Sequence, residues 1–223
     1  DPNDPETSLI KDFQYFDRSK VTRVNGQWFY QGHRLNVFAS IDFAFSKRKG
    51  ADYTSIVVVG IDGYNNYYVL DIDRFQTNSI GDYFRHILAL HQKWDFRKIR
   101  AEVTVAQEAI VQSIKNDHIR PHGLALSVEE YRPTRNEGNK EERIEAILFS
   151  KYDNKQIWHY QGGNCQVLEE ELTLQNPPHD DVKDALASCI DMCVAPSGNL
   201  GLSFNRTRER LNSMTHNRFG GLA

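Results

Sequence analysis

The chain has 223 residues, of which 39% are hydrophobic and 11% aromatic, so it can bury one sizeable core without disulfides or structural metals. It has no apolar run of about 18 residues that could span a bilayer, and its polar, acidic start lacks the order of a signal peptide. The formal net charge of −3 provides no overall attraction to nucleic acid. We therefore expect a soluble intracellular protein with no membrane partner.

The first part of the chain changes character near residue 20. Residues 1–20 are rich in Asp, Pro and Lys and resemble a linker or arm. The turn-prone pairs Asn25-Gly26 and Gln31-Gly32 flank an apolar stretch at 28–30, which predicts two hairpin corners.

Three strands are predicted next, at 35–45, 53–61 and 67–72. The second contains an unbroken apolar run at 56–59, which indicates burial on both faces. The intervening Asp62-Gly63 pair favours a hairpin, so these strands are expected to be antiparallel neighbours.

The hydrophobic period then becomes helical. A helix is predicted from Ser79, and a strand at 98–105, a helix at 108–114 and a strand at 124–131 follow it. This alternation predicts a parallel half of the same sheet.

The remaining elements are a helix capped by Asn139, a short extended piece around Trp158 and Tyr160, and a helix at 181–194. Residues 196–223 lack periodicity and are predicted to be a flexible or partner-bound tail. The expected organisation is an α/β domain at 21–195 between the arm and this tail.

Three cysteines occur, at 165, 189 and 193. Cys189 and Cys193 share one face of the last helix with apolar residues, so they are predicted to be buried thiols. No Cys-x-x-Cys pair or nearby histidine pair completes a zinc set. Their odd number argues against a secreted disulfide framework.

Acidic residues occupy unusual positions in three of these elements. Asp42 lies within an apolar strand, where an ionised carboxylate needs a cation, a hydrogen-bond network or water. Glu102 lies near the end of a strand expected beside the first. Asp180 and Asp181 open the last helix, in which Asp181 and Asp184 share a face.

Carboxylates converging from these elements would suit two Mg²⁺ or Mn²⁺ ions. Such ions, roughly 3.5–4 Å apart, assist in-line attack of water on a phosphodiester. Each acid could instead have an ordinary structural role. Asp42 could form an ion pair with a buried Lys or Arg, Glu102 could pair with Arg100, and Asp180 or Asp181 could cap the helix. Their combination in this order of elements favours the metal site.

Five segments carry a resemblance to a known family, across about residues 12–194. They are Ile41-Asp42-Phe43-Ala44, Gly50-Ala51-Asp52-Tyr53-Thr54, Glu102, Asn139-Lys140-Glu141-Glu142-Arg143-Ile144 and His179-Asp180-Asp181-Val182-Lys183-Asp184-Ala185-Leu186. Together they resemble the nuclease domain of the large terminase subunit of tailed bacteriophages. This resemblance implies a ribonuclease H-like, RuvC-like fold with a mixed sheet flanked by helices.

The resemblance implies a catalytic role and metal ligation for Asp42, Glu102 and Asp181, and metal ligation for Asp184 and Asp180. His179 is a minor candidate, because some terminases use a histidine in this helix; its ordinary reading is a solvated loop residue. The segment 132–143 would form a hairpin or loop that holds the DNA backbone. The residues implied in phosphate contacts, which position DNA without reading its sequence, are Lys47, Arg48, Lys49, Arg135, Lys140 and Arg143.

The resemblance further implies an endonuclease that cuts concatemeric double-stranded viral DNA during genome packaging in the host cell cytoplasm. The chain lacks a G-x-x-x-x-G-K-[ST] phosphate loop, so we expect the nuclease half alone. An amino-terminal ATPase domain, the portal protein and the small terminase subunit would be its partners. Two alternatives stay open: another nuclease of this fold, such as a Holliday-junction resolvase, a transposase-like enzyme or a ribonuclease H, and a non-catalytic docking module.

Overall fold

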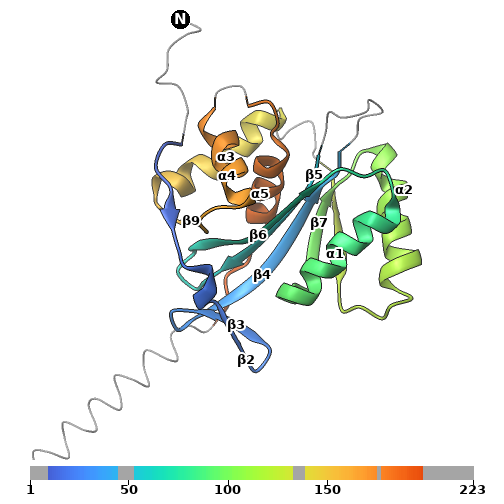
Figure 1. Ribbon diagram of the computed structural model, residues 1–223, viewed down its shortest axis with the longest axis horizontal. Helices are drawn as coiled ribbons and strands as arrows, with labels where there is room; N and C mark the ends of the chain where they lie inside the picture. The colour runs from blue at the N-terminus through green and yellow to red at the C-terminus, as the bar shows by residue number, and fades with distance from the viewer. Residues whose placement is uncertain (1–9, 45–52, 133–138, 175–176, 198–223) are drawn as a thin grey trace, which may run out of the picture.

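The structure is a computed structural model that describes residues 10–44, 53–132, 139–174 and 177–197. Over these ranges the chain forms one mixed sheet of nine strands with helices on both faces (Figure 1). The strand order is β1-β9-β6-β5-β4-β3-β2, and β7 pairs with β4 and with β8. The predicted α/β fold class is confirmed.

Two tight hairpins open the sheet, joining β2 (Thr22–Val24), β3 (Gln27–Tyr30) and β4 (His33–Asp42). Asn25 and Gly26 have φ values of 51° and 75°, and Gln31 and Gly32 have 49° and 81°. Two successive residues with positive φ form the primed turn that matches strand twist. Both predicted corners are confirmed.

The centre of the sheet is antiparallel, as predicted. β5 (Thr54–Ile61) pairs with β4 on one side and with β6 (Tyr67–Phe75) on the other. Every residue of β5 is buried, which explains its lack of polar alternation.

The parallel half of the sheet is also confirmed. It contains α1 (Ile80–Trp94), β7 (Lys98–Glu102), α2 (Val105–Ser113), the π-helical segment η2 (Ile114–Ile119) and β8 (Ser127–Tyr131). β7 runs parallel to β4 and to β8. The predicted boundary between β7 and α2 was three residues too late, because Thr104 and Gln107 form a capping box that starts the helix earlier.

The last described elements are α3 (Lys140–Asp153), β9 (Ile157–His159), α4 (Asn164–Thr173) and α5 (Asp181–Met192). The Asn139 side chain accepts a hydrogen bond from the Glu142 amide at 2.8 Å, so the predicted cap is confirmed. α4 was not predicted, because its buried residues Cys165 and Leu168 precede an acidic run that resembles a solvated surface.

Part of the segment taken from the sequence as an arm packs onto this domain. β1 (Gln14–Tyr15) pairs in parallel with β9, and η1 (Arg18–Lys20) is a 3₁₀ turn. Ile10 and Phe16 are buried in the common core. Residues 1–9 and 198–223 lie outside the described ranges.

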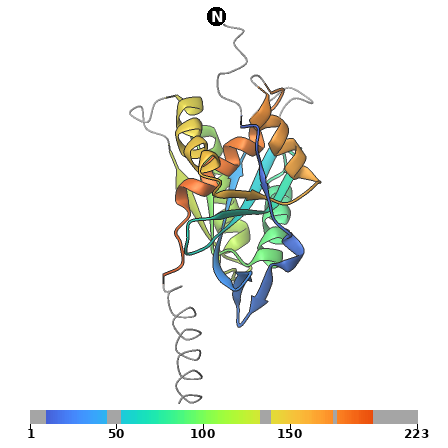
Figure 2. The same cartoon turned by 90° about the vertical axis from the view of Figure 1, so that its left-hand side faces the viewer.

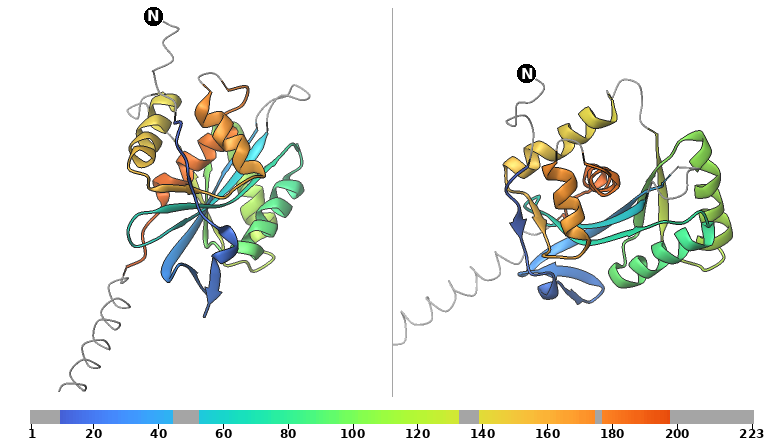
Figure 3. Two further views of the ribbon diagram at one scale, coloured as in Figure 1. Left: turned by 60° about the vertical axis from the view of Figure 1, so that its left-hand side comes forward. Right: turned by 45° about the horizontal axis from the view of Figure 1, so that its top comes forward.

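The two faces of the sheet carry different helices. α1 and α2 lie on one face, and α3, α4 and α5 on the other (Figures 2 and 3). The β4 side chains alternate accordingly: Ser40 donates a hydrogen bond to the Ala185 carbonyl of α5, whereas Phe43 packs edge-on against Tyr83 of α1. Asp42 shares its parity with Ser40 and therefore faces α5.

The cysteines and the helix lengths bear on two further expectations. Cys165 and Cys189 are buried and Cys193 is half-buried, and all three are free thiols. Within the described ranges, none of the helices combines the length and apolarity needed to cross a bilayer.

Candidate metal centre

Two of the predicted acids end neighbouring strands. Asp42 is the last residue of β4 and Glu102 is the last residue of β7. Because β4 and β7 are parallel, with Ile41 opposite Ala101, their carboxyl ends meet at one edge of the sheet. α5 packs against both strands, and its first turn carries Asp181 and Asp184.

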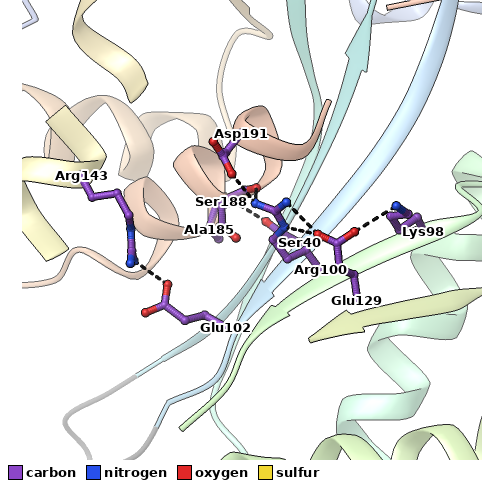
Figure 4. A network of polar contacts seen from close by, with 9 residues as sticks. All are labelled: Ser40, Lys98, Arg100, Glu102, Glu129, Arg143, Ala185, Ser188 and Asp191. Carbon is purple, nitrogen blue, oxygen red and sulfur yellow. Dashed lines mark hydrogen bonds and ion pairs between the residues drawn. The ribbon is translucent and has the colours of Figure 1, made fainter. Parts of the chain in front are cut away.

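An internal arginine ties α5 to the sheet beside this edge (Figure 4). Arg100 of β7 donates to Asp191 at 2.6 Å, to Glu129 at 2.8 Å and to the Ser188 carbonyl at 3.4 Å. Its side chain is 10% exposed. Because Arg100 is committed to Glu129 and Asp191, the simple Glu102–Arg100 pair considered from the sequence is wrong.

Replacing Arg100 with methionine is expected to destabilise the domain by about 2–3 kcal/mol, since it leaves Glu129 and Asp191 without their shared cation. Partial exposure of both acids keeps the loss below that of a fully buried pair. Urea unfolding followed by circular dichroism measures it. Unchanged stability would show that Arg100 does not hold α5.

Basic side chains from the first turn of α3 enter the acidic edge. The Lys140 ammonium contacts Oδ2 of Asp184 and lies 3.6 Å from Oδ2 of Asp42. Arg143 donates to Oε2 of Glu102 at 2.7 Å. These contacts bring Asp42 and Asp184, from two elements far apart in sequence, onto one ammonium group.

A further cation lies near Asp181. One terminal nitrogen of Arg74, in β6, is 3.7 Å from Oδ2 of Asp181, and both side chains are largely buried. The Arg74 guanidinium lies over the Tyr53 ring, 3.4 Å from its centroid. At 3.7 Å the ion pair is too long for a hydrogen bond.

Burial and neighbouring charges alter the pKa values of these acids. Burial raises the pKa of Asp42 to about 7; Lys140 opposes this shift, and the charges of Asp184, Glu102 and Asp181 add to it. Burial likewise raises the pKa of Asp184 to about 6, with Lys140 again opposing. Burial raises the pKa of Asp181 against the effect of Arg74. Lys140 and Arg74 therefore offset only part of the pKa increase that burial causes in these acids.

Several buried oxygens at this edge have no hydrogen-bond partner, namely Oδ1 of Asp184, Oδ2 of Asp181 and Oγ of Ser55. A cavity of about 470 Å³ adjoins Asp184, and Glu102, Lys140 and Arg143 are among its other lining residues. Buried polar atoms are normally satisfied, and hard divalent cations take carboxylate oxygens. The donor set therefore fits Mg²⁺ or Mn²⁺.

The predicted site residues fall into three groups. Asp42, Glu102, Asp181 and Asp184 are brought to one edge, with Lys140 and Arg143 among them. Asp180 is exposed at the N-cap of α5, and the half-buried His179 ring packs edge-on against Tyr53. The basic residues Lys47, Arg48, Lys49 and Arg135 lie outside the described ranges.

Lys140 and Arg143 lie on a helix. The resemblance implied a hairpin or loop at 132–143, but helix α3 starts at Lys140 within this segment. The capping box formed by Asn139 and Glu142 explains why the helix starts there.

Sequence reasoning missed two charged residues of this region. Arg74 follows Ile72 on the same face of β6, so an arginine at an inward position was the available signal. Glu171 of α4 is 3% exposed, and burial raises its pKa to about 8. Its Oε2 accepts a hydrogen bond from the Lys183 amide at 2.7 Å, which caps the first turn of α5. Nothing in its acidic surroundings marked it.

A tighter group of potential ligands lies elsewhere, whereas no three of the described acids Asp42, Glu102, Asp181 and Asp184 bring their ligand atoms within 4.8 Å of one another. Within the described ranges, His159, Cys165 and Glu169 are the one set of three His, Cys, Asp or Glu residues whose ligand atoms all lie within 4.8 Å of one another. Both ring nitrogens of His159 are engaged, with Tyr152 at 2.8 Å and Glu169 at 3.0 Å. We read this group as a buried hydrogen-bond network that joins β9 to α3 and α4.

Comparison with known proteins gives a structural match only. No protein-family model matches the sequence, and no curated protein matches it. The large terminase nuclease from the thermophilic phage G20c superposes with a TM-score of 0.54 at 13% identity, covering 82% of this chain and 95% of that one. This chain has the fold of a large-terminase nuclease domain.

Two further structures agree. The G20c large terminase nuclease with bound magnesium gives a TM-score of 0.54 at 14% identity, covering 84% of this chain and 99% of that one. The terminase nuclease domain of human cytomegalovirus gives 0.53 at 16% identity, covering 71% and 83%. At such identities the match establishes the ribonuclease H-like fold of the terminase nucleases.

Proposed function

We propose that this chain is a divalent-metal-dependent endodeoxyribonuclease that cuts concatemeric double-stranded viral DNA during genome packaging. The observation that carries the proposal is that Asp42, Glu102, Asp181 and Asp184 lie at one sheet edge, near enough for their charges to act on Asp42. Buried oxygens of Asp181 and Asp184 lack hydrogen-bond partners there. The terminase-nuclease fold and the magnesium-bound G20c structure support it.

In this proposal Asp42, Glu102 and Asp181 hold two Mg²⁺ or Mn²⁺ ions, with Asp184 completing the set. The chemistry that such ions supply is activation of a water and stabilisation of the leaving oxygen of a phosphodiester. Arg100 and Glu171 hold α5 so that its two acids face the strand ends. Lys140 and Arg143 supply positive charge where the DNA backbone would approach.

The finer assignments belong to the same proposal. An ATPase domain ahead of this one, the portal protein and the small terminase subunit would be partners of the full assembly. The folded domain includes residues from Ile10 onward, because β1 pairs with β9 and Ile10 and Phe16 belong to its core, and we propose that residues 196–223 lead to such partners.

A second function is favoured by one observation: Asp42 and Asp184 contact Lys140, Glu102 contacts Arg143, and Asp181 lies near Arg74. A non-catalytic docking module would use such ion pairs structurally. The partnerless oxygens argue against it, because structural buried pairs need complete hydrogen bonding to be stable.

Incubation with supercoiled plasmid and Mn²⁺, with and without chelator, tests the proposal. We expect nicked and then linear DNA with Mn²⁺ and intact plasmid with chelator. Parallel assays on linear duplex, four-way junction and RNA–DNA hybrid separate a terminase-type substrate from those of a resolvase or a ribonuclease H. An intact plasmid, together with no Mn²⁺ binding by calorimetry, would favour the docking module.

A further inference from the structure

Arg74 lies in the same cross-strand row of the sheet as Asp42. In the cross-strand register, Asp42 of β4 lies opposite Ser55 of β5, and Ser55 lies opposite Arg74 of β6. Directly opposite residues of antiparallel strands project on the same face. The row Asp42–Ser55–Arg74 therefore lies under α5, and Asp73, with the opposite parity, instead contacts His86 of α1.

The guanidinium of Arg74 is oriented but not satisfied. Tyr53 stacks on it, which restrains its plane. Its Nε and one terminal nitrogen are buried without a hydrogen-bond partner. Its ion-pair partner, Oδ2 of Asp181, is 3.7 Å away and is itself without a hydrogen bond. Arginine stays charged in proteins, so its unpaired donors need an acceptor and its charge favours an anion there.

Asp181 is a poor permanent partner for this arginine. A carboxylate that holds a divalent ion has less negative charge to offer a neighbouring guanidinium. Glu171, another acid near Arg74, accepts the Lys183 amide of α5 through Oε2, while its Oε1 makes no hydrogen bond. The anion that must reach this edge for cleavage is a DNA phosphate, whose paired oxygens match the donor fork of arginine.

We propose that Arg74 is a phosphate-binding residue of the metal centre, contacting a non-bridging oxygen of the DNA phosphate held there. This inference rests on the proposed nuclease function. Arg74 then fixes the backbone from the β6 side, while Lys140 and Arg143 approach from α3. Arg74 keeps 14% of its side chain exposed, although its Nε and one terminal nitrogen are buried.

The test compares Arg74→Met and Arg74→Lys with the wild type. A matched control is Arg85→Met, which removes an arginine charge from α1, where Arg85 is 76% exposed and pairs with Asp82. Binding of a fluorescent duplex is measured with Ca²⁺ over a range of salt, cleavage with Mn²⁺, and Mn²⁺ binding by calorimetry. Circular dichroism monitors folding.

For Arg74→Met we expect duplex binding to weaken by about 10-fold or more. The slope of log affinity against log salt should fall by about one, because one phosphate contact is lost. Mn²⁺ binding should persist. Arg74→Lys should keep the salt slope but cleave DNA more slowly, because an ammonium lacks the planar donor fork of arginine. If Arg74→Met does not fold, the comparison of Arg74→Lys with the wild type serves as the test. Arg85→Met should behave as wild type.

Unchanged duplex affinity and salt slope in Arg74→Met, with altered Mn²⁺ binding, would overturn the inference and leave Arg74 as a charge partner of Asp181. That result leaves plasmid cleavage by the wild type intact. Failure of the wild type itself to bind Mn²⁺ and cut plasmid would instead reject the proposed function, and this inference with it.

Discussion

Asp42→Asn and Asp181→Asn are each expected to lower Mn²⁺-dependent plasmid cleavage by about 10³-fold or more. Each replaces a charged oxygen donor at the convergence of β4, β7 and α5. The electrostatic contribution of a catalytic ion amounts to several kcal/mol, and each tenfold in rate corresponds to about 1.4 kcal/mol. Initial rates of nicking, read from agarose gels at matched protein concentration, measure the loss.

Asp62→Asn is the matched control for these variants. Asp62 is 1% exposed at the β5–β6 turn, where its carboxylate accepts hydrogen bonds from the Tyr64 and Asn66 amides and from the Tyr68 hydroxyl. It is a buried aspartate that lies outside the acidic edge. We expect lower stability with unchanged cleavage per folded molecule. Cleavage that survives in Asp42→Asn and Asp181→Asn would reject the metal-ligand assignment.

The second expected result concerns stability without divalent ions. At pH 8, Asp42→Asn should raise the thermal midpoint by about 5 °C, because it removes a carboxylate that burial and neighbouring acids disfavour in its charged form. Mn²⁺ should raise the wild-type midpoint, since an ion that binds only the folded state stabilises it. Differential scanning fluorimetry in chelator and in Mn²⁺ measures both shifts.

The stability gained by Asp42→Asn should depend on pH in a defined direction. Folding raises the pKa of Asp42 from 3.8 to about 7, so the folded state holds its proton more tightly than the unfolded state. Its contribution to stability therefore falls as pH rises from about 4 to about 7, and the full cost is present above that range. The gain from Asp42→Asn should be largest at pH 8 and vanish near pH 4. A midpoint lowered at pH 8 would indicate that the Lys140 ion pair is net stabilising.

Local chemistry explains which parts of the fold could be predicted. Asn25-Gly26 forms a primed turn because Asn and Gly both tolerate positive φ, whereas in Gln31-Gly32 only the glycine has that preference. Asn139 caps α3 through contacts within four residues. Helix α4 was missed because Glu169, Glu170 and Glu171 obscure its short apolar stripe, which becomes buried when α4 packs against β6 and α5.

For the candidate site, the acids and their cations differ in what could be foreseen. Asp42 was identifiable from the sequence because a carboxylate in an apolar strand is energetically conspicuous wherever that strand lies. The pairing of Lys140 with Asp42 and Asp184, and the arrival of Arg74 beside Asp181, were decided by the tertiary structure alone. Those contacts depend on strand register and on how α3 and α5 cross the sheet, and long-range packing sets both.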